Sequence, residues 1–198
     1  MTRSSAALWL LAVAGCASAP HQAAPAAPTA SSSSGEAGAA PLGLPRDAAE
    51  LNARVLTFLG RPASAAELTR EHVERWILKL DAQRGDPQAF GAWGKLDGGW
   101  SYTLELRVEA QSGRKKLWLT YSGDDNASMG PVCAPDFEGF VKALSDAGYT
   151  YEKVYGEHNR FIAGSFVRGG AQLQVVPRGV SNEDAAHLCA HMLILEAP

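Results

Sequence analysis

The sequence has no excess of basic residues, because its 18 Lys and Arg residues are outnumbered by 21 Asp and Glu residues, which gives a formal net charge of -3. Proteins that bind nucleic acids carry a basic excess or a basic stripe on one face. The one compact basic run, Arg114–Lys116, falls at a predicted hairpin turn, where charged side chains are solvated. The charge balance therefore argues against nucleic acid as a partner.

Long apolar runs and common catalytic motifs are missing as well. The main apolar stretch, Ala6–Val13, is far shorter than the roughly 20 residues of a membrane-spanning helix. The sequence contains no Gly-x-Ser-x-Gly elbow, Walker loop or dinucleotide fingerprint. We therefore predict a non-enzymatic protein without a cofactor, although an active site built from scattered residues would leave no motif.

What the sequence does contain begins with a secretory signal. Arg3 gives a short positive region, Ala6–Val13 gives the apolar core, and Val13-Ala14-Gly15-Cys16 follows. This quartet resembles the lipobox of bacterial lipoproteins. The resemblance implies cleavage before Cys16, a diacylglycerol on its sulfur, and an acyl chain such as palmitate on its amine. Ala17 in place of Asp implies sorting to the outer membrane, facing the periplasm by default. The alternative is an ordinary signal peptide with a free Cys16.

Composition divides the rest of the chain in two. Residues 16–45 are mostly Ala, Pro, Ser and Gly, and they contain almost no large apolar side chains that could offset the entropy of folding. We predict a signal peptide at residues 1–15, a lipidated Cys16 and disordered tether at residues 16–45, and a single globular domain at residues 46–198.

The hydrophobic patterns of residues 46–198 predict an α+β fold, with an antiparallel sheet of about five strands (a hairpin plus a meander) and helices mainly on one face. We expect a first helix with an apolar stripe at Leu51, Val55, Leu56 and Leu59, which stops at Gly60–Pro62. We expect further helices from the capping box Ser64–Glu67 through Leu80, from Phe137 to the stop at Gly148, and from Ser181 through Leu188. We expect strands at residues 100–110, 117–121, 149–155, 161–167 and 173–176. Residues 192–196 fit either a helix or a strand.

Two cysteines remain beside Cys16, namely Cys133 and Cys189. In an exported domain, two unpaired thiols would be exposed to oxidation, so we predict a disulfide between them. A catalytic Cys133 with a distant His is the alternative.

His187 and His191 are four residues apart, which would place both imidazoles on one face of the predicted last helix, as in zinc sites. No third ligand is identifiable, so they are only weak candidates for a metal site. Asp124–Asn126 and Glu157–Arg160 are interpreted as polar turns, because the former lacks the Gly and distal Glu of a calcium loop.

Two tryptophans are candidates for a protein interface. Trp118 points away from the apolar side of its strand, and Trp93 lies with Phe90 in a predicted loop. Exposed aromatics near arginine are typical of protein interfaces, but the second face of the sheet could instead be covered by the first two helices. We expect a module that binds another envelope protein or acts in envelope assembly. The alternative is a metal-dependent enzyme or a toxin acting through the C-terminal domain.

Overall fold

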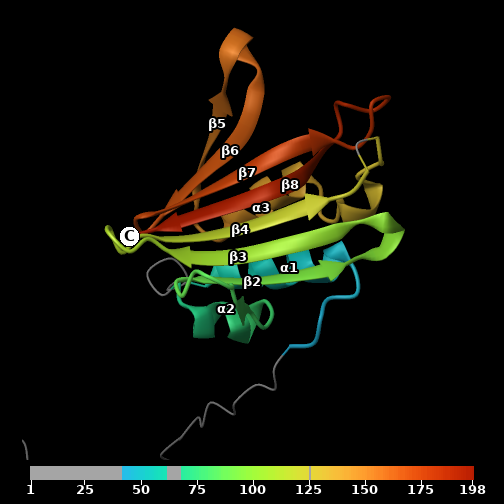
Figure 1. Cartoon of the computed structure of the whole chain (residues 1–198). Coiled ribbons are helices and arrows are strands. Elements are labelled where there is room, and N and C mark those ends of the chain that lie inside the picture. Colours follow the sequence, from blue (N-terminus) through green and yellow to red (C-terminus); the bar gives the residue numbers. More distant parts are fainter. Residues whose placement is uncertain (1–41, 62–67, 125) are drawn as a thin grey trace, which may run out of the picture. The chain divides into compact units, whose positions relative to one another are not determined.

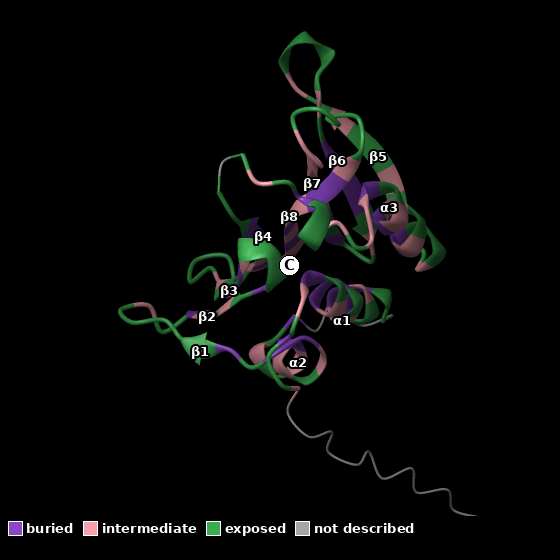
Figure 2. Ribbon diagram, turned by 90° about the vertical axis from the view of Figure 1, so that its right-hand side faces the viewer, coloured by how far each residue is buried: buried purple, intermediate pink, exposed green. Residues whose placement is uncertain are grey.

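An eight-stranded antiparallel sheet organises the domain, in the order β1-β2-β3-β4-β8-β7-β6-β5 (β2 to β8 are labelled in Figure 1, and β1 in Figure 2). The computed structural model describes residues 42–61, 68–124 and 126–198. The strands are β1 (Asp81–Ala82), β2 (Ala89–Lys95), β3 (Ser101–Val108), β4 (Lys115–Ser122), β5 (Thr150–Tyr155), β6 (Phe161–Arg168), β7 (Ala171–Gly179) and β8 (Leu188–Ala197). The helices are α1 (Ala48–Gly60), α2 (Arg70–Trp76) and α3 (Phe137–Asp146).

The predicted α+β class and antiparallel sheet are confirmed, but about five strands was too few. The prediction missed β1, β2 and β8. In β2, the sequence Ala-Phe-Gly-Ala-Trp-Gly-Lys contains two glycines and no β-branched residue, so it has little strand signal of its own. Pairing with β3 over seven residues makes it a strand, and Phe90 and Trp93 therefore lie in β2 and not in a loop.

Alternation of side chains gives the sheet two different faces. Leu104, Leu119 and Leu193 are paired in register across β3, β4 and β8, and all three are buried. The intervening residues point the other way, as the two-residue period of a strand requires. The three helices lie on the side of the buried leucines (Figures 1 and 2). The core is thus a single layer between the helices and one sheet face.

Each helix starts at a side-chain cap. The caps are Asp47 for α1, Thr69 for α2 and Asp136 for α3, and each accepts a hydrogen bond from a backbone N–H of the first turn. The predicted second helix was too long, since α2 starts at Arg70 and ends at Trp76. Its expected capping box, at residues 64–67, lies outside the described residues.

The predicted last helix is wrong. Residues 181–187 form a loop, and β8 begins at Leu188 and includes the ambiguous residues 192–196. The cap signal in the sequence is real but local: Ser181 Oγ accepts from the Asp184 N–H, and Asp184 Oδ1 accepts from the His187 N–H. Such bonds also make isolated turns. Pairing of β8 with both β4 and β7 outweighs the helical tendency of this segment.

The ribbon formed by β5 and β6 is paired with β7 over only part of its length. Pairing of β6 with β7 starts only at Gly164, opposite Val175, and β7 has an irregularity between Val176 and Pro177. The ladder between β6 and β7 thus ends at Val175, while β7 continues to pair with β8 as far as Gly179. Beyond this point the ribbon extends away from β7 (Figure 1).

Two buried or half-buried polar side chains connect the helices to the sheet. Asn52 of α1 accepts from the Tyr121 hydroxyl at 2.7 Å and donates to the Ala134 carbonyl at 3.0 Å. Arg168 of β6 donates to the carbonyls of Leu59 and Ala147, near the last turns of α1 and α3, at 2.5 and 2.6 Å. Cationic donors at helix C-termini satisfy carbonyls that have no partner within the helix.

Candidate functional site

No helix of the described residues covers the second face of the sheet, which we call the open face. Register places its central residues in three rows that cross β2, β3, β4 and β8. The first row is Trp93, Thr103, Thr120 and Met192; the second is Gly91, Glu105, Trp118 and Ile194; the third is Ala89, Arg107, Lys116 and Glu196. Aromatic, aliphatic and charged side chains are therefore interleaved on one face of the sheet.

Trp118 lies at the middle of the open face and is half-buried by neighbouring side chains. The Lys116 ammonium is 4.9 Å and the Arg107 guanidinium 6.0 Å from the centroid of its ring. Both distances fall within the range of cation–π contacts. The prediction that this tryptophan faces away from the apolar side of β4 is confirmed, and the helices lie on the other side of the sheet.

The charges of the open face are paired among themselves. Lys116 forms an ion pair with Glu196 at 2.7 Å, and Arg107 forms one with Glu105 at 2.9 Å. These pairs are partly exposed, so each contributes at most about 1 kcal/mol to stability. Arg107 also lies 3.9 Å from an Asp86 carboxylate oxygen, so it is shared between two acidic side chains.

A hollow of about 410 Å³ opens beside Trp118. It is lined by Thr103, Glu105, Arg107, Trp118, Thr120 and Met192. The two threonines are directly opposite one another in register and are much shorter than the tryptophan and methionine beside them. The hollow is therefore the space that short side chains leave between long ones.

Apolar exposure continues to both sides of the hollow. Trp93 in β2 is 62% exposed, and it is paired in register with Thr103. At the other end of the sheet, Val167 of β6 is 48% exposed and lies opposite Gln172, which belongs to the row of Glu196. The role of Trp93 and Trp118 in an interface stays a prediction.

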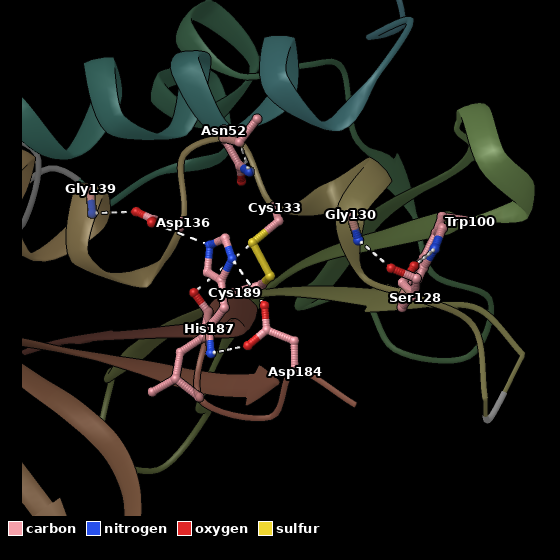
Figure 3. The surroundings of a disulfide bond; sticks show 12 residues. Asn52, Trp100, Ser128, Gly130, Cys133, Asp136, Gly139, Asp184, His187 and Cys189 are labelled. Carbon is pink, nitrogen blue, oxygen red and sulfur yellow. Dashed lines mark hydrogen bonds and ion pairs between the residues drawn. A yellow bond between two sulfur atoms is a disulfide. The ribbon is translucent and has the colours of Figure 1, made fainter. Parts of the chain in front are cut away.

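The predicted disulfide is confirmed: Cys133 and Cys189 are bonded, with their Cα atoms 4.9 Å apart (Figure 3). Cys133 follows the short 3-10 turn Gly130–Val132, and Cys189 is fully buried near the start of β8 rather than in a helix. The bond ties the segment that leads into α3 to the sheet. It also occupies the thiol that a nucleophilic Cys133 would need.

The two candidate metal ligands do not share a helix. His187 lies in the loop before β8, with Nε2 3.4 Å from an Asp136 carboxylate oxygen and Nδ1 3.8 Å from Asp184 (Figure 3). His191 lies within β8, where desolvation by burial and the nearby Arg178 charge lower its pKa, against a backbone hydrogen bond with Tyr121 that raises it. Over the described ranges, no group of three or more His, Cys, Asp and Glu residues is placed to hold a metal ion.

The remaining polar segments are turns, as predicted. Asp124 and Asn126 are exposed in the loop after β4, while Asp125 lies outside the described residues. Glu157–Asn159 is the 3-10 turn between β5 and β6, and His158 and Asn159 have positive φ angles of 56° and 57°. Asparagine and histidine are among the residues that adopt this conformation most readily.

Sequence reasoning missed the hollow, although part of its signal was present. Thr103, Glu105 and Arg107 occupy the polar positions of the alternating strand, so their shared face could be predicted. Met192 could not be placed there, because its segment was ambiguous between a helix and a strand.

Cys16 and the predicted signal peptide lie outside the described residues, and nothing in the structure tests them. None of the helices in the described ranges has the length and apolar character needed to cross a membrane. No family model matches the chain, and no curated protein or solved structure is significantly similar to it.

Proposed function

We propose that the protein is an outer-membrane lipoprotein, anchored through acyl chains on Cys16, whose periplasmic domain binds another envelope protein through the open face. In this proposal the domain assembles partners and catalyses no reaction. The anchor rests on the lipobox-like quartet Val13–Cys16. Two or more acyl chains hold a protein stably at a membrane, whereas one chain holds it only marginally.

The observation that carries the binding role is the composition of the open face. The solvated face of an antiparallel sheet is normally polar. This one presents Trp93, Trp118, Met192 and Ile194 beside Arg107, and no described helix covers them. Aromatic residues, methionine and arginine are the residue types enriched at protein interfaces. Packing within the domain does not account for their presence on this face.

Site-specific photocrosslinking in cells tests the binding role. A benzophenone amino acid at Trp93 or Ile194 should yield one adduct of constant mass, because both positions are on the open face. The matched control is Lys142, which is exposed on α3 at the other side of the sheet. The adduct should weaken when Trp118 is also changed to Ala. Equal adducts from all three positions, or none from the open face, would contradict the proposal.

The anchor has its own test. The intact mass of the mature protein should equal residues 16–198 plus the acyl groups, and Cys16→Ser should release the protein from the membrane fraction. A mature chain without lipid mass would contradict the anchor and leave the binding role to be judged by crosslinking.

A further inference from the structure

The exposed loop that follows β4 carries an acceptor pattern for an N-linked glycan. Asn126 is followed by Ala127 and Ser128, which makes the pattern Asn-x-Ser. In exported proteins this pattern is a glycosylation acceptor when it lies in a surface loop. We propose that Asn126 is a modification site that receives an oligosaccharide on its amide nitrogen in the periplasm. The inference rests on the export that the proposed function requires, and it does not depend on what the open face binds.

Asn126 is distinguished from the other asparagines of the chain by its neighbours. Two positions after Asn52, Asn159 and Asn182 the sequence has Arg, Phe and Asp, and not the Ser or Thr of an acceptor. A three-residue pattern is short enough to occur by chance. Bacterial oligosaccharyltransferases require, in addition, an acidic residue two positions before the acceptor, and Asp124 occupies that position. The segment around Asn126 therefore meets both requirements.

The acceptor and the two residues that an enzyme would recognise are all accessible. Asp124, Asn126 and Ser128 are exposed. Asn52, in contrast, is fully buried and accepts a hydrogen bond from the Tyr121 hydroxyl, so an enzyme cannot reach it in the folded domain. Surface exposure is the structural context in which an Asn-x-Ser pattern can act as an acceptor.

Hydrogen bonds to the body of the domain hold the backbone of this loop. The Ala127 carbonyl accepts from Arg178 at 3.2 Å, and the Ser128 carbonyl accepts from the Trp100 indole at 3.1 Å (Figure 3 shows Ser128 beside Trp100). The side chains of Asn126 and Ser128 stay exposed while these carbonyls are bonded. The loop therefore presents the acceptor at the surface of the folded domain.

The acceptor segment itself is held by bonds that open readily. The Ala127 N–H donates to the Asp124 carbonyl at 2.9 Å, and the Gly130 N–H donates to Ser128 Oγ at 3.2 Å. Water replaces the lost partner when an exposed bond of this kind opens, so the net cost is small. The Ser128 hydroxyl also keeps its own hydrogen, which it can donate to an enzyme. The segment can therefore adapt to an active site without unfolding of the sheet.

The proposed transfer is a substitution at the first carbon of a sugar. The co-substrate is an oligosaccharide joined through pyrophosphate to a membrane polyprenol. The Asn126 amide nitrogen forms a bond to that carbon, the bond between the carbon and the pyrophosphate oxygen breaks, and polyprenyl pyrophosphate leaves. The nitrogen loses one proton, which water or the leaving group takes up. No oxidant or reductant takes part.

The experiment is tandem mass spectrometry of the full chain, purified from the membranes of the bacterium that naturally makes it. After reduction and trypsin digestion, Asn126 is the only asparagine of the peptide Leu117–Lys142. This peptide should gain the mass of whole sugar units. The peptides Val154–Arg160 and Gly179–Pro198, which contain Asn159 and Asn182, are the matched controls and should gain none. An unmodified peptide Leu117–Lys142 would overturn the proposal.

Four variants, produced in the same bacterium, identify the acceptor and its recognition residues. Asn126→Gln and Ser128→Ala should abolish the added mass, whereas Ser128→Thr should retain it because threonine supplies the same hydroxyl. Asp124→Asn should lower the modified fraction by roughly tenfold or more, because a hydrogen bond to a charged group is lost. Sugar mass that survives Asn126→Gln would overturn the proposal, since the glycan would then be on a serine.

The outcomes separate this inference from the proposed function. An unmodified Asn126 in chains that carry lipid on Cys16 would overturn this inference alone. A glycan on Asn126, without crosslinking from the open face, would contradict the proposed binding role and leave the glycosylation site in place. An unmodified Asn126 in chains that retain residues 1–15 would contradict both, because such chains have not been processed for export.

Discussion

The two faces of the sheet are made by alternate residues of the same strands, yet they are constrained by different things. Leu193 packs under the helices, while its neighbour Ile194 lies on the open face. Residues on the covered face are selected by the close packing of the core. Residues on the open face have no described helix packed against them, so packing against a helix does not explain the tryptophans and methionine there. The comparison separates what holds this domain together from what it presents to other molecules.

Removing the disulfide, which joins the buried Cys189 of β8 to Cys133, should give the largest effect. The bond closes a loop with a sequence separation of 56 residues. Loop-closure entropy then predicts that Cys133→Ala with Cys189→Ala lowers the free energy of unfolding by about 4 kcal/mol. Urea denaturation measures this, with the reduced wild-type protein as a control that should behave like the double variant. A loss below about 1 kcal/mol would show that the reduced chain retains most of the constraint.

The sharpest test of the comparison uses neighbouring residues of one strand. Leu193→Ala should lower the free energy of unfolding by about 3 kcal/mol, because it leaves a cavity beneath α1. Ile194→Ala should cost less than about 1 kcal/mol, because its side chain is partly exposed. With the benzophenone at Trp93, Ile194→Ala should weaken the crosslinked adduct more than Leu193→Ala does. Equal losses of stability would mean that the open face is part of the folding core.

The smallest effect is a dependence of stability on pH through His191. Its pKa is lowered in the folded state, chiefly by burial, so the unfolded chain takes up a proton first as the pH falls. The free energy of unfolding should therefore decrease as the pH falls through about 6.5 and below, and the decrease should end once the folded state is also protonated. His191→Gln should flatten this slope between pH 7.5 and 5. His158→Gln, in the exposed turn, is the control and should keep the wild-type slope.

Local sequence signals predicted the parts of the fold that do not depend on distant partners. Alternation over residues 100–110 is strong enough to specify β3, and the apolar stripe of α3 is equally clear. The disulfide followed from the small number of cysteines and the predicted export. In contrast, β2 and β8 are strands mainly because neighbouring strands pair with them. Propensity alone does not contain that information.

Only part of the candidate site could be predicted, because the rest of it depends on how distant strands pair. Trp118 could be assigned to the outward side of a strand, because its own strand alternates. The hollow also needs Met192, whose place depends on β8 pairing with β4 in one particular register. Helix propensity around Ser181–Leu188 predicted a helix instead, so the weak metal candidates His187 and His191 depended on an element that does not form.

The position of β8 has a consequence for how the chain matures. Strands β1–β4 form one half of the sheet and β5–β7 the other, and β8 joins them although it follows both in sequence. During synthesis, the two halves can be made but cannot be united until residues 188–197 have emerged from the ribosome. If the chain is exported, the complete sheet can therefore form only after β8 has also crossed the membrane.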